Sequence, residues 1–324
     1  MYMAVWVGDI MLATTSKALM QESKQGVLSV FEARDLGEAR NFVGLEIRRN
    51  RAARTLSISQ TKMTADVVSR YGQESARNRD VPMAQGVQLR KEGEPLSEDC
   101  PYRALVGSLL YLAVCTRPDI AYAVGALARH MAQPTTEHWQ AAKGVVRYLA
   151  GTAEYGIVYG DSNSTLFGYS DADYGGDLDT RRSTTGYVFK VAGGAVLWSS
   201  KLQKTVAVST TEAEYMAAAA SVKEALWWKS ISVDLQLGST AYQPVLIFTD
   251  NQAALQLVKN PILHQRAKHI DVQYHFSRQR VQLQHVRFNW CPTKDMVADI
   301  MTKPLPRDKL QRFRLDMGVQ QRLE

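Results

Sequence analysis

The sequence predicts an α/β protein whose C-terminal half forms a mixed sheet covered by helices. Two observations support this prediction. After residue 156, apolar and amphipathic segments follow one another in an order that indicates three meandering strands, a helix, a strand, a helix pair, a strand and a closing helix. Two of the apolar segments also end in an aspartate, at Asp171 and Asp250. We expect these strands to be parallel neighbours, which places both aspartates at the edge where open α/β sheets bind ligands.

The composition indicates an intracellular protein with a polyanionic partner. The 324 residues suit two or three domains. A net charge of +7 and a pI near 9.2 fit a partner such as nucleic acid. The three cysteines are widely spaced and odd in number, so they indicate neither a disulfide framework nor a zinc site, and they predict a reducing compartment. No apolar run approaches the roughly 18 residues that span a bilayer, so we expect no membrane partner.

The first 72 residues predict a small α+β unit that begins abruptly. Its expected elements are a hairpin with arms at 3–7 and 10–12, a helix over 17–31, strands over 42–47 and 55–59, and a helix over 61–71. The hairpin turn is predicted at Gly8-Asp9, and Gly72 stands at the usual stop position of the last helix. A folded domain rarely starts inside a buried hairpin, so we expect relatives to carry a segment upstream of Met1.

A polar segment and three helices are expected next. Residues 73–100 contain Pro82 and Pro95 and show little periodicity, which predicts a linker. Pro101 opens the first helix, and Thr136 is the expected cap of the third. The three helices are predicted over 101–116, 119–131 and 136–150.

The remaining segments supply the C-terminal sheet and its cover. Strands are expected over 157–159, 166–170, 186–191, 195–199, 245–249 and 283–290. Helices are expected over 211–235, 251–259 and 270–282, and around Met296 and Leu310.

Four carboxylates lie at the edges of these elements. Asp171 and Asp250 end strands, whereas Glu214 and Asp299 lie in helical patterns. A carboxylate at the end of a buried strand is costly to desolvate unless a cation or hydrogen bonds meet it. Together the four side chains offer only oxygen ligands, which Mg²⁺ and Mn²⁺ prefer. The residues therefore predict a divalent-metal site.

The carboxylate of the long helix has two candidates. Glu212 and Glu214 are two residues apart, so they point to roughly opposite sides of a helix, and only one can reach the metals. Both also fit a capping box, as Ser209-x-x-Glu212 and as Thr211-x-x-Glu214, which would be a purely structural role.

A series of motifs resembles one known family. In chain order the motifs are Asp35–Ala39, Tyr111–Tyr122, Arg147–Leu149, Ser170–Tyr174, Arg182–Gly186, Ser209–Tyr215, Thr249–Gln252, Lys268–Asp271 and Ala298–Pro306. The part from about Leu166 resembles the ribonuclease H domain of copia-type (Pseudoviridae) retrotransposon Pol polyproteins. The helical part before it resembles the reverse transcriptase region of the same polyprotein. The resemblance covers nearly the whole chain, and this set of motifs in this order is highly specific.

The resemblance implies how the chain is divided. Residues 1–72 would be a truncated reverse transcriptase palm, 73–100 a linker, 101–155 a helical thumb or connection subdomain, and 156–324 a ribonuclease H-like domain with a mixed five-stranded sheet. We expect the truncated palm to be the least stable part, because it leaves open strand edges and an uncovered apolar face. We expect the part from about Tyr155 to be active on its own.

The resemblance also implies the site residues and their chemistry. The family's catalytic, metal-binding carboxylates fall on Asp171, Glu214, Asp250 and Asp299. Glu214 is favoured over Glu212 because Glu-Tyr-Met-Ala is similar to the family's pattern at this position. Members of the family cut the RNA strand of RNA–DNA hybrids, with two Mg²⁺ or Mn²⁺ ions about 3.5 to 4 Å apart.

The polymerase motif of the family is degenerate in this chain. Such reverse transcriptases carry two adjacent aspartates after an aromatic and an apolar residue. The matching string is Trp6-Val7-Gly8-Asp9, so Gly8 replaces a metal ligand and Asp9 stands alone. We therefore expect no templated DNA synthesis.

Further residues are predicted to contact nucleic acid, each with a structural alternative. The predicted substrate-binding residues are Arg182, Ser183, Thr184, Lys201, Lys204 and Asn251. A basic loop such as 181–185 grips a phosphate about as often as it is simply solvated. Basic residues of the helical segment would follow a duplex backbone, or else the segment only holds the nuclease part in place; they are Arg103, Arg129, Lys143 and Arg147.

Two functions from different classes fit the sequence. The first is a divalent-metal endonuclease for RNA–DNA hybrids, acting in the cytoplasm, a virus-like particle or the nucleus, with other parts of the retrotransposon polyprotein as partners. The second is a catalytically silent transposon fragment that only binds nucleic acid. The complete carboxylate set favours the first, whereas the abrupt start and Gly8 favour the second.

Overall fold

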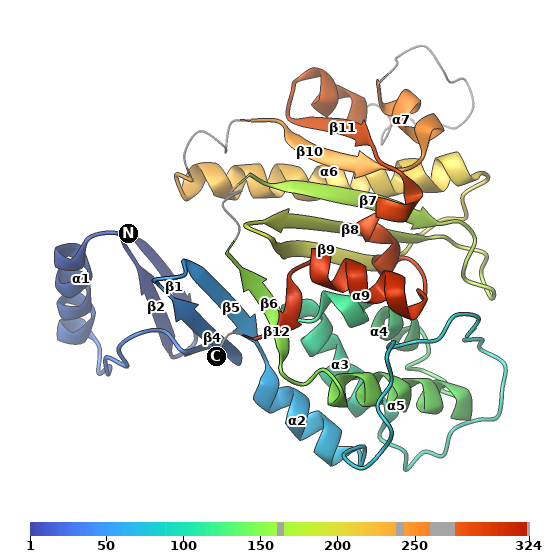
Figure 1. Ribbon diagram of the computed structural model, residues 1–324, viewed down its shortest axis with the longest axis horizontal. Helices are drawn as coiled ribbons and strands as arrows, with labels where there is room; N and C mark the ends of the chain where they lie inside the picture. Colours follow the sequence, from blue (N-terminus) through green and yellow to red (C-terminus); the bar gives the residue numbers. More distant parts are fainter. Residues whose placement is uncertain (88, 161–164, 238–242, 260–275, 323–324) are drawn as a thin grey trace.

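The computed structural model describes residues 1–87, 89–160, 165–237, 243–259 and 276–322. The described elements form two five-stranded sheets, a separate hairpin and the helices that pack on them (Figure 1). No helix in this described part is long and apolar enough to cross a membrane. Of the helix predicted over 270–282, residues 276–282 are helical, and the rest lies outside the described residues, as does the motif Lys268–Asp271.

A mixed five-stranded sheet forms in the C-terminal half, and this confirms the predicted fold class. Its strands are β7 (Phe167–Asp173), β8 (Thr184–Val191), β9 (Gly194–Leu202), β10 (Val245–Thr249) and β11 (Val286–Trp290). Their order across the sheet is β11-β10-β7-β8-β9. The meander β7-β8-β9 is antiparallel, whereas β10 runs parallel to both β7 and β11. The two strands that end in aspartates are therefore parallel neighbours, as predicted.

Helices cover both faces of the mixed sheet (Figure 1). They are α6 (Thr210–Asp234) and α7 (Gln252–Lys259), the 3-10 helix η4 (Val297–Met301), and α9 (Arg307–Asp316). Neighbouring residues of β8 point to opposite faces, so Phe189 packs in the cluster with α6, whereas Val188 packs in the cluster with η4. Gly186 of β8 allows η4 to approach closely, because a Cβ there would lie 2.7 Å from Cβ of Met301. The sheet is thus enclosed except at its edges.

The second sheet joins strands from three distant parts of the chain. They are β3 (Asn41–Phe42), β4 (Leu45–Asn50), β5 (Thr55–Ser59), β6 (Tyr155–Tyr159) and β12 (Val319–Gln321), in the order β12-β6-β5-β4-β3. The expected strand 42–47 is divided by a turn at Val43-Gly44, where both residues have positive φ. The strand predicted over 157–159 joins β5 and β12, not the mixed sheet. Gly156 permits this pairing, because a Cβ there would lie 2.4 Å from the Ile58 carbonyl oxygen.

The predicted helical segment is present, with two changes at helix ends. Its elements are α2 (Thr61–Arg70), α3 (Tyr102–Cys115), η1 (Pro118–Ile120), α4 (Ala121–Ala128) and α5 (Thr136–Ala150). The helix expected over 119–131 is a short 3-10 turn followed by α4. The predicted cap Thr136 is wrong by one residue. The cap is Thr135, because His138 Nδ1 accepts a hydrogen bond from the Thr135 backbone N–H at 2.9 Å and the Thr135 hydroxyl accepts one from the His138 N–H.

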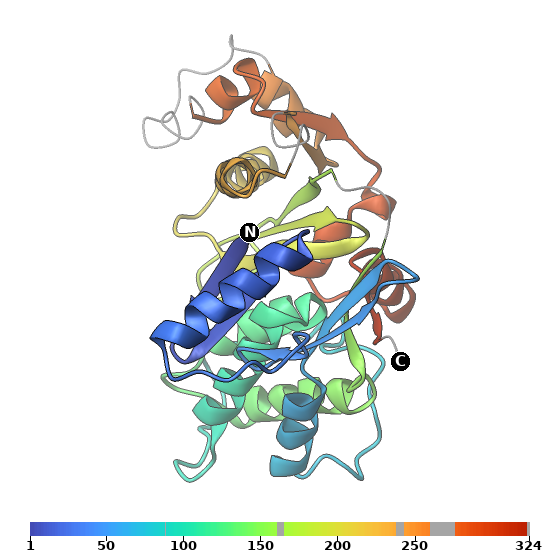
Figure 2. The same cartoon turned by 90° about the vertical axis from the view of Figure 1, so that its left-hand side faces the viewer.

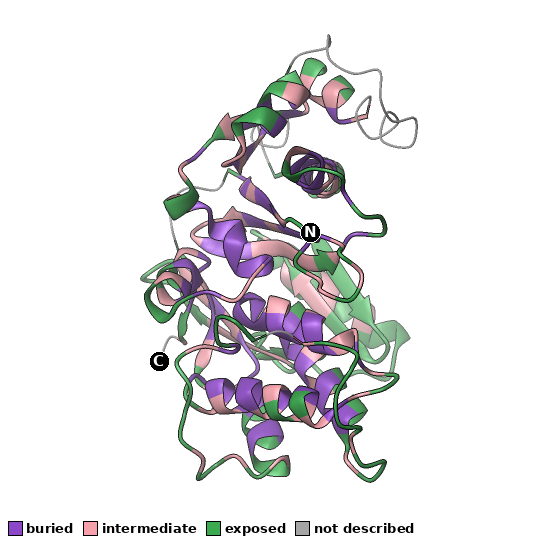
Figure 3. Ribbon diagram, turned by 90° about the vertical axis from the view of Figure 1, so that its right-hand side faces the viewer, coloured by how far each residue is buried: buried purple, intermediate pink, exposed green. Residues whose placement is uncertain are grey.

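One hydrophobic core connects the helical segment to the C-terminal half (Figure 3). Its buried members from the helices include Leu105, Leu109, Leu112, Val124, Leu127, Val145 and Leu149, and those from the C-terminal half include Val188, Ala195, Ile300, Met301, Leu310 and Phe313. Trp198 of β9 also donates a hydrogen bond from Nε1 to the Ala113 carbonyl oxygen at 2.8 Å. A chain cut near Tyr155 would expose this shared core. The structure therefore argues against the expectation that the C-terminal part is active on its own.

A buried polar network ties the same two parts together. Arg117 and Asp119 form an ion pair of 2.8 Å between Nη2 and Oδ2, and their side chains are essentially inaccessible to solvent. The Tyr148 hydroxyl of α5 donates to Asp119 at 2.7 Å, and Arg314 of α9 donates to that hydroxyl at 3.1 Å. Burial is the largest single influence on Asp119 and would raise its pKa, but the charge of Arg117 and the hydrogen bonds from Arg117 and Tyr148 together hold that pKa below its ordinary value.

The N-terminal lobe, residues 1–31, lies at one side of the molecule (Figure 1) and faces the viewer in Figure 2, and it is attached far more loosely. It consists of β1 (Tyr2–Trp6), β2 (Asp9–Ala13) and α1 (Lys17–Val30), and none of its residues is buried. Among the described strands, β1 and β2 pair only with each other. The turn lies at Val7-Gly8 and not at Gly8-Asp9, and Val7 is 95% exposed with a positive φ. Residues 41–72, in contrast, belong to the second sheet and pack against α5 through α2.

Limited proteolysis should therefore remove the N-terminal lobe first. We expect the earliest cuts within residues 32–40, which are exposed and carry no regular structure, because segments with few buried contacts open at the lowest free energy. Mass spectrometry of a digestion time course gives the order of cuts. Early cleavage inside 41–72, or a lobe that resists protease as long as 166–202 does, would contradict this expectation.

Candidate metal centre

Strand register places Asp171 and Asp250 at the same level of the mixed sheet. Phe248 of β10 lies opposite Tyr169 of β7, and their rings stack with centroids 5.3 Å apart. Continuing this register by two residues brings Asp250 opposite Asp171 on the same face. The convergence expected from two strand-end aspartates is thus present.

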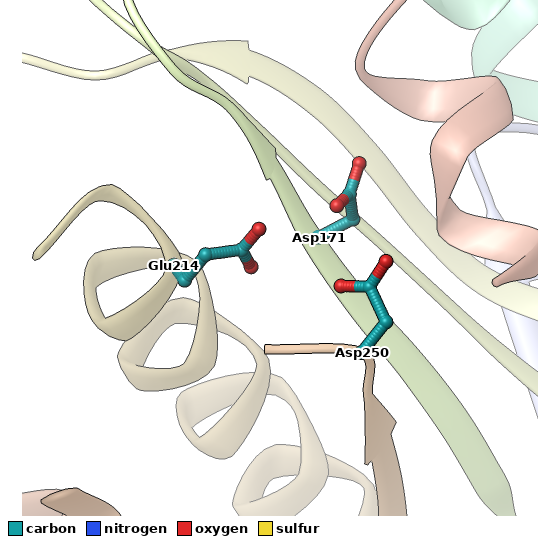
Figure 4. Close-up of side chains that lie close together, drawn as sticks. All are labelled: Asp171, Glu214 and Asp250. Atoms are coloured by element: carbon teal, nitrogen blue, oxygen red, sulfur yellow. The ribbon is translucent and has the colours of Figure 1, made fainter. Parts of the chain in front are cut away.

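The start of α6 decides which glutamate faces these aspartates. Ser209 caps the helix by accepting a hydrogen bond from the Glu212 N–H at 3.2 Å, and the Glu212 carboxylate accepts one from the Val208 N–H at 2.8 Å. Glu212 therefore fixes the helix start. Glu214, two residues further, turns toward the strand ends (Figure 4).

Asp171, Glu214 and Asp250 form a compact cluster (Figure 4). One carboxylate oxygen from each lies within 4.8 Å of the other two. Asp171 is 3% exposed and Glu214 is 8% exposed. Oε2 of Glu214 is buried without a hydrogen-bond partner. A cation held by the three oxygens would supply that partner.

The cluster is electrostatically strained without a cation. Burial raises the pKa of Glu214 to about 10, and the neighbouring charges of Asp171 and Asp250 add to the shift. Burial also raises the pKa of Asp171 to about 7; Lys303 opposes this shift, and Asp299 adds to it. Without a metal ion, carboxylates that are crowded together bind protons at neutral pH, because protonation removes their mutual repulsion. An all-oxygen set with one orphaned oxygen fits Mg²⁺ or Mn²⁺.

Asp299 lies beside the cluster but is not part of it in this structure. Its side chain is 1% exposed, and each of its oxygens meets a lysine. Lys303 Nζ lies 2.7 Å from Oδ1, and Lys309 of α9 contacts Oδ2. Lys303 Nζ also lies 4.0 Å from Oδ2 of Asp171. The predicted fourth ligand is therefore near the site, with a lysine between it and Asp171.

Three of the predicted substrate-binding side chains have partners within the fold. Ser183 and Thr184 are buried, the Ser183 hydroxyl accepts from the Gly175 N–H at 3.1 Å, and the Thr184 hydroxyl accepts from Arg129 at 3.2 Å. Asn251 caps α7 by accepting from the Ala254 N–H at 2.8 Å. Ser183 and Asn251 thus accept from backbone N–H groups that need partners, and Thr184 accepts from the Arg129 side chain, so all three have a structural role.

The predicted basic contacts fall into two groups. Lys201 and Lys204 are exposed and Arg182 is half-buried, so they remain predicted contacts. In the helical segment, Arg103 donates to the Met131 carbonyl oxygen and Arg129 pairs with Asp177 at 3.1 Å, so both hold the fold. Lys143 and Arg147 of the same segment remain predictions.

The degenerate polymerase motif belongs to no group of metal-binding side chains among the described residues. Gly8 is in the turn of the N-terminal hairpin, and Asp9 is exposed at the start of β2. Among the described residues, the only group of three metal-binding side chains is the cluster at Asp171.

Sequence reasoning missed three residues at this site: Thr302, Lys303 and Lys309. Thr302 donates a short hydrogen bond from its hydroxyl to Asp171. The spacing of Asp299 and Lys303, four residues apart, was a usable signal for an ion pair. The contact of Lys303 with Asp171 could not be predicted from the sequence, because it depends on the packing of η4 against β7.

Comparisons with known proteins give relatives over nearly the whole chain. The chain is 40% identical over 314 residues to the retrovirus-related Pol polyprotein from transposon TNT 1-94 of Nicotiana tabacum, which covers 95% of this chain and 23% of that protein. It is 35% identical over 231 residues to the transposon Ty5-1 protein of Saccharomyces cerevisiae, and this alignment covers 69% of this chain and 73% of that protein. The chain thus spans about a quarter of the length of the long polyprotein relatives.

A solved structure matches the fold across most of the chain. A foamy viral protease–reverse transcriptase in complex with double-stranded DNA aligns with a TM-score of 0.52 at 13% identity, over 90% of this chain and 46% of that one. At this identity the match concerns the fold alone. No family model matches the sequence.

Proposed function

This chain belongs to the family of copia-type retrotransposon Pol polyproteins, and from this membership we propose that it is a ribonuclease H that cuts the RNA strand of RNA–DNA hybrids. One observation carries the proposal: Asp171, Glu214 and Asp250 converge within 4.8 Å at the ends of two parallel strands. The proposed setting is intracellular, beside other parts of the polyprotein.

The proposed cofactor is a pair of Mg²⁺ or Mn²⁺ ions. When bound, such ions activate a water for attack and stabilise the leaving oxygen of a phosphodiester. Asp171, Glu214 and Asp250 would hold them, and Asp299 would join from η4. Thr302 fixes the Asp171 carboxylate through its hydrogen bond. The carboxylates bind and orient, so none of them has to transfer a proton.

The test is a cleavage assay with the whole chain, because its core spans both halves. We expect cutting of the RNA strand of a labelled hybrid with Mg²⁺ or Mn²⁺, and little cutting of single-stranded RNA or duplex DNA. The strand preference would come from 2′-hydroxyl contacts in the shallow minor groove. A folded chain that binds hybrid but never cuts across both metal titrations would instead identify a silent, nucleic-acid-binding fragment.

The proposal includes an inactive reverse transcriptase part. A polymerase site needs convergent carboxylates, and Asp9 is exposed in the loosely attached N-terminal lobe with Gly8 beside it. We expect no primer extension with either metal. Extension above background, lost in Asp9→Asn, would contradict this part.

The raised pKa values predict how metal stabilisation depends on pH. Asp171 has a folded pKa of about 7 against an ordinary value of 3.8. In metal-free protein, its contribution to stability is present below pH about 4 and is lost as the pH rises through about 7. Metal binding needs the ionised form, so the gain in Tm from Mg²⁺ should be small at pH 5.5 and large at pH 8.

Thermal unfolding with and without Mg²⁺, at matched ionic strength, checks this prediction. Asp250→Asn serves as the control, because it removes one of the three clustered carboxylates. If the gain in Tm from Mg²⁺ is equal at both pH values, or is larger at pH 5.5, then protons do not compete with the metal for this cluster.

A further inference from the structure

The contacts of Lys303 are unusual for a lysine beside a proposed metal site. Its ammonium lies 2.7 Å from Asp299 Oδ1 and 4.0 Å from Asp171 Oδ2, so one cation of the chain itself bridges two proposed ligands. The two carboxylates come from different elements, β7 and η4. The space between them is where a divalent ion shared by Asp171 and Asp299 would lie.

The local structure holds Lys303 in this position. Asp299 lies in η4, and Lys303 follows four residues later, a spacing that brings two side chains together on a helical turn. Pro304 follows directly and restricts the backbone of Lys303. Thr302, the residue before, donates its hydroxyl to the same Asp171 oxygen that Lys303 approaches. Three consecutive residues thus fix the ammonium against both carboxylates.

The charges indicate what Lys303 does in the absence of metal. Asp299 is almost fully buried and has Lys303 on one oxygen and Lys309 on the other. A buried carboxylate without a partner is strongly unfavourable, so these lysines stabilise Asp299 when no ion is present. In the described ion pairs, Lys309 contacts Asp299 and none of the other three acids. Lys303, in contrast, also lies 4.0 Å from Asp171 of the cluster.

We propose that Lys303 is a built-in counter-cation that occupies the second metal position and must leave before Asp299 joins the site. The inference rests on the proposed two-metal function. One divalent ion can bind at Asp171, Glu214 and Asp250 with Lys303 in place. A second ion competes with the ammonium for Asp171 and Asp299. Lys303 thereby sets the concentration of metal at which the full site assembles, and it acts as a positioning residue.

The test is a Mn²⁺ titration of the whole chain, followed by isothermal calorimetry and by electron paramagnetic resonance, without substrate. Wild type should bind one ion more tightly than the second. Lys303→Met removes the charge and keeps the length of the side chain, so it should tighten the second binding step about tenfold, which corresponds to about 1.4 kcal/mol of binding free energy. Lys303→Arg, which keeps the charge, should bind as wild type does.

Lys294→Met is the matched control. Lys294 is exposed, lies in the adjoining turn and makes no ion pair with these acids in the described contacts. Its variant therefore removes one positive charge from the same region but leaves Lys303 between Asp171 and Asp299. Its titration should match wild type. An equal tightening in Lys294→Met and Lys303→Met would assign the effect to net charge and overturn the proposal.

Other outcomes separate this inference from the proposed function. If wild type binds Mn²⁺ and Lys303→Met leaves the second step unchanged or weaker, the inference is wrong and the metal site stands. If wild type binds no Mn²⁺, the proposed function fails together with the inference. Thermal unfolding of Lys303→Met checks that the variant is folded, and Lys303→Gln gives a second charge-free variant if Met is not tolerated.

Discussion

Asp250→Asn should reduce hybrid cleavage by about three orders of magnitude, which corresponds to about 4 kcal/mol of transition-state stabilisation. The substitution keeps the shape of the side chain and removes a charge that the metals need. Asp250 is the most exposed member of the cluster and makes no ion pair in the described contacts, so the fold should not depend on its charge. Single-turnover cleavage at saturating hybrid measures the loss.

The matched control for this prediction is on α6. Glu212→Gln retains a side-chain acceptor for the Val208 N–H, so it should change cleavage only a few-fold, whereas Glu214→Gln should lose nearly as much as Asp250→Asn. Hybrid binding by all three variants should stay within a few-fold of wild type. Cleavage that survives Asp250→Asn, or equal losses in Glu212→Gln and Glu214→Gln, would remove the cluster from the mechanism.

Asp119→Asn should have the largest effect on stability. The substitution leaves the Arg117 guanidinium buried without its counter-charge, and breaking a buried pair from one side costs about 3 to 5 kcal/mol. The network reaches from η1 through Tyr148 to Arg314 of α9, and the hydrophobic core is shared across the same boundary. The loss should therefore destabilise the helical segment and the C-terminal half together.

Urea unfolding of wild type and variant measures this effect by circular dichroism and tryptophan fluorescence. Asp80→Asn is the control, because Asp80 pairs with Arg307 at 3.6 Å with both side chains 61% exposed, and such surface pairs contribute about 0 to 1 kcal/mol. The two probes should report one coincident transition for residues 41–322. Separate transitions, with only one shifted by Asp119→Asn, would mean that the two halves fold independently.

The cluster could be predicted from the sequence because its signals are local. An apolar segment followed by an aspartate marks a strand end, and two such segments, at Asp171 and Asp250, meet when their strands are parallel neighbours. The two-residue spacing of Glu212 and Glu214 separates a capping role from a site role, since successive positions on a helix face different directions. The similarity of Glu-Tyr-Met-Ala to the pattern of the copia-type polyproteins at this position favoured Glu214, and the structure places Glu214 at the cluster.

Tertiary structure alone decided how the parts of the chain join. The pattern of 157–159 predicts a strand, but periodicity does not name a partner, and β6 pairs with β5, which lies about a hundred residues earlier. The hydroxyls of Ser183 and Thr184 look available in a polar loop, and only packing shows that Gly175 and Arg129 occupy them. The position of Lys303 depends on η4 packing against β7. The sequence by itself determined the elements and the acids at their ends, because these follow from short-range pattern. Strand partners, the shared core and the lysine between two aspartates depend on contacts between residues far apart in the chain, so they were fixed only when the chain folded.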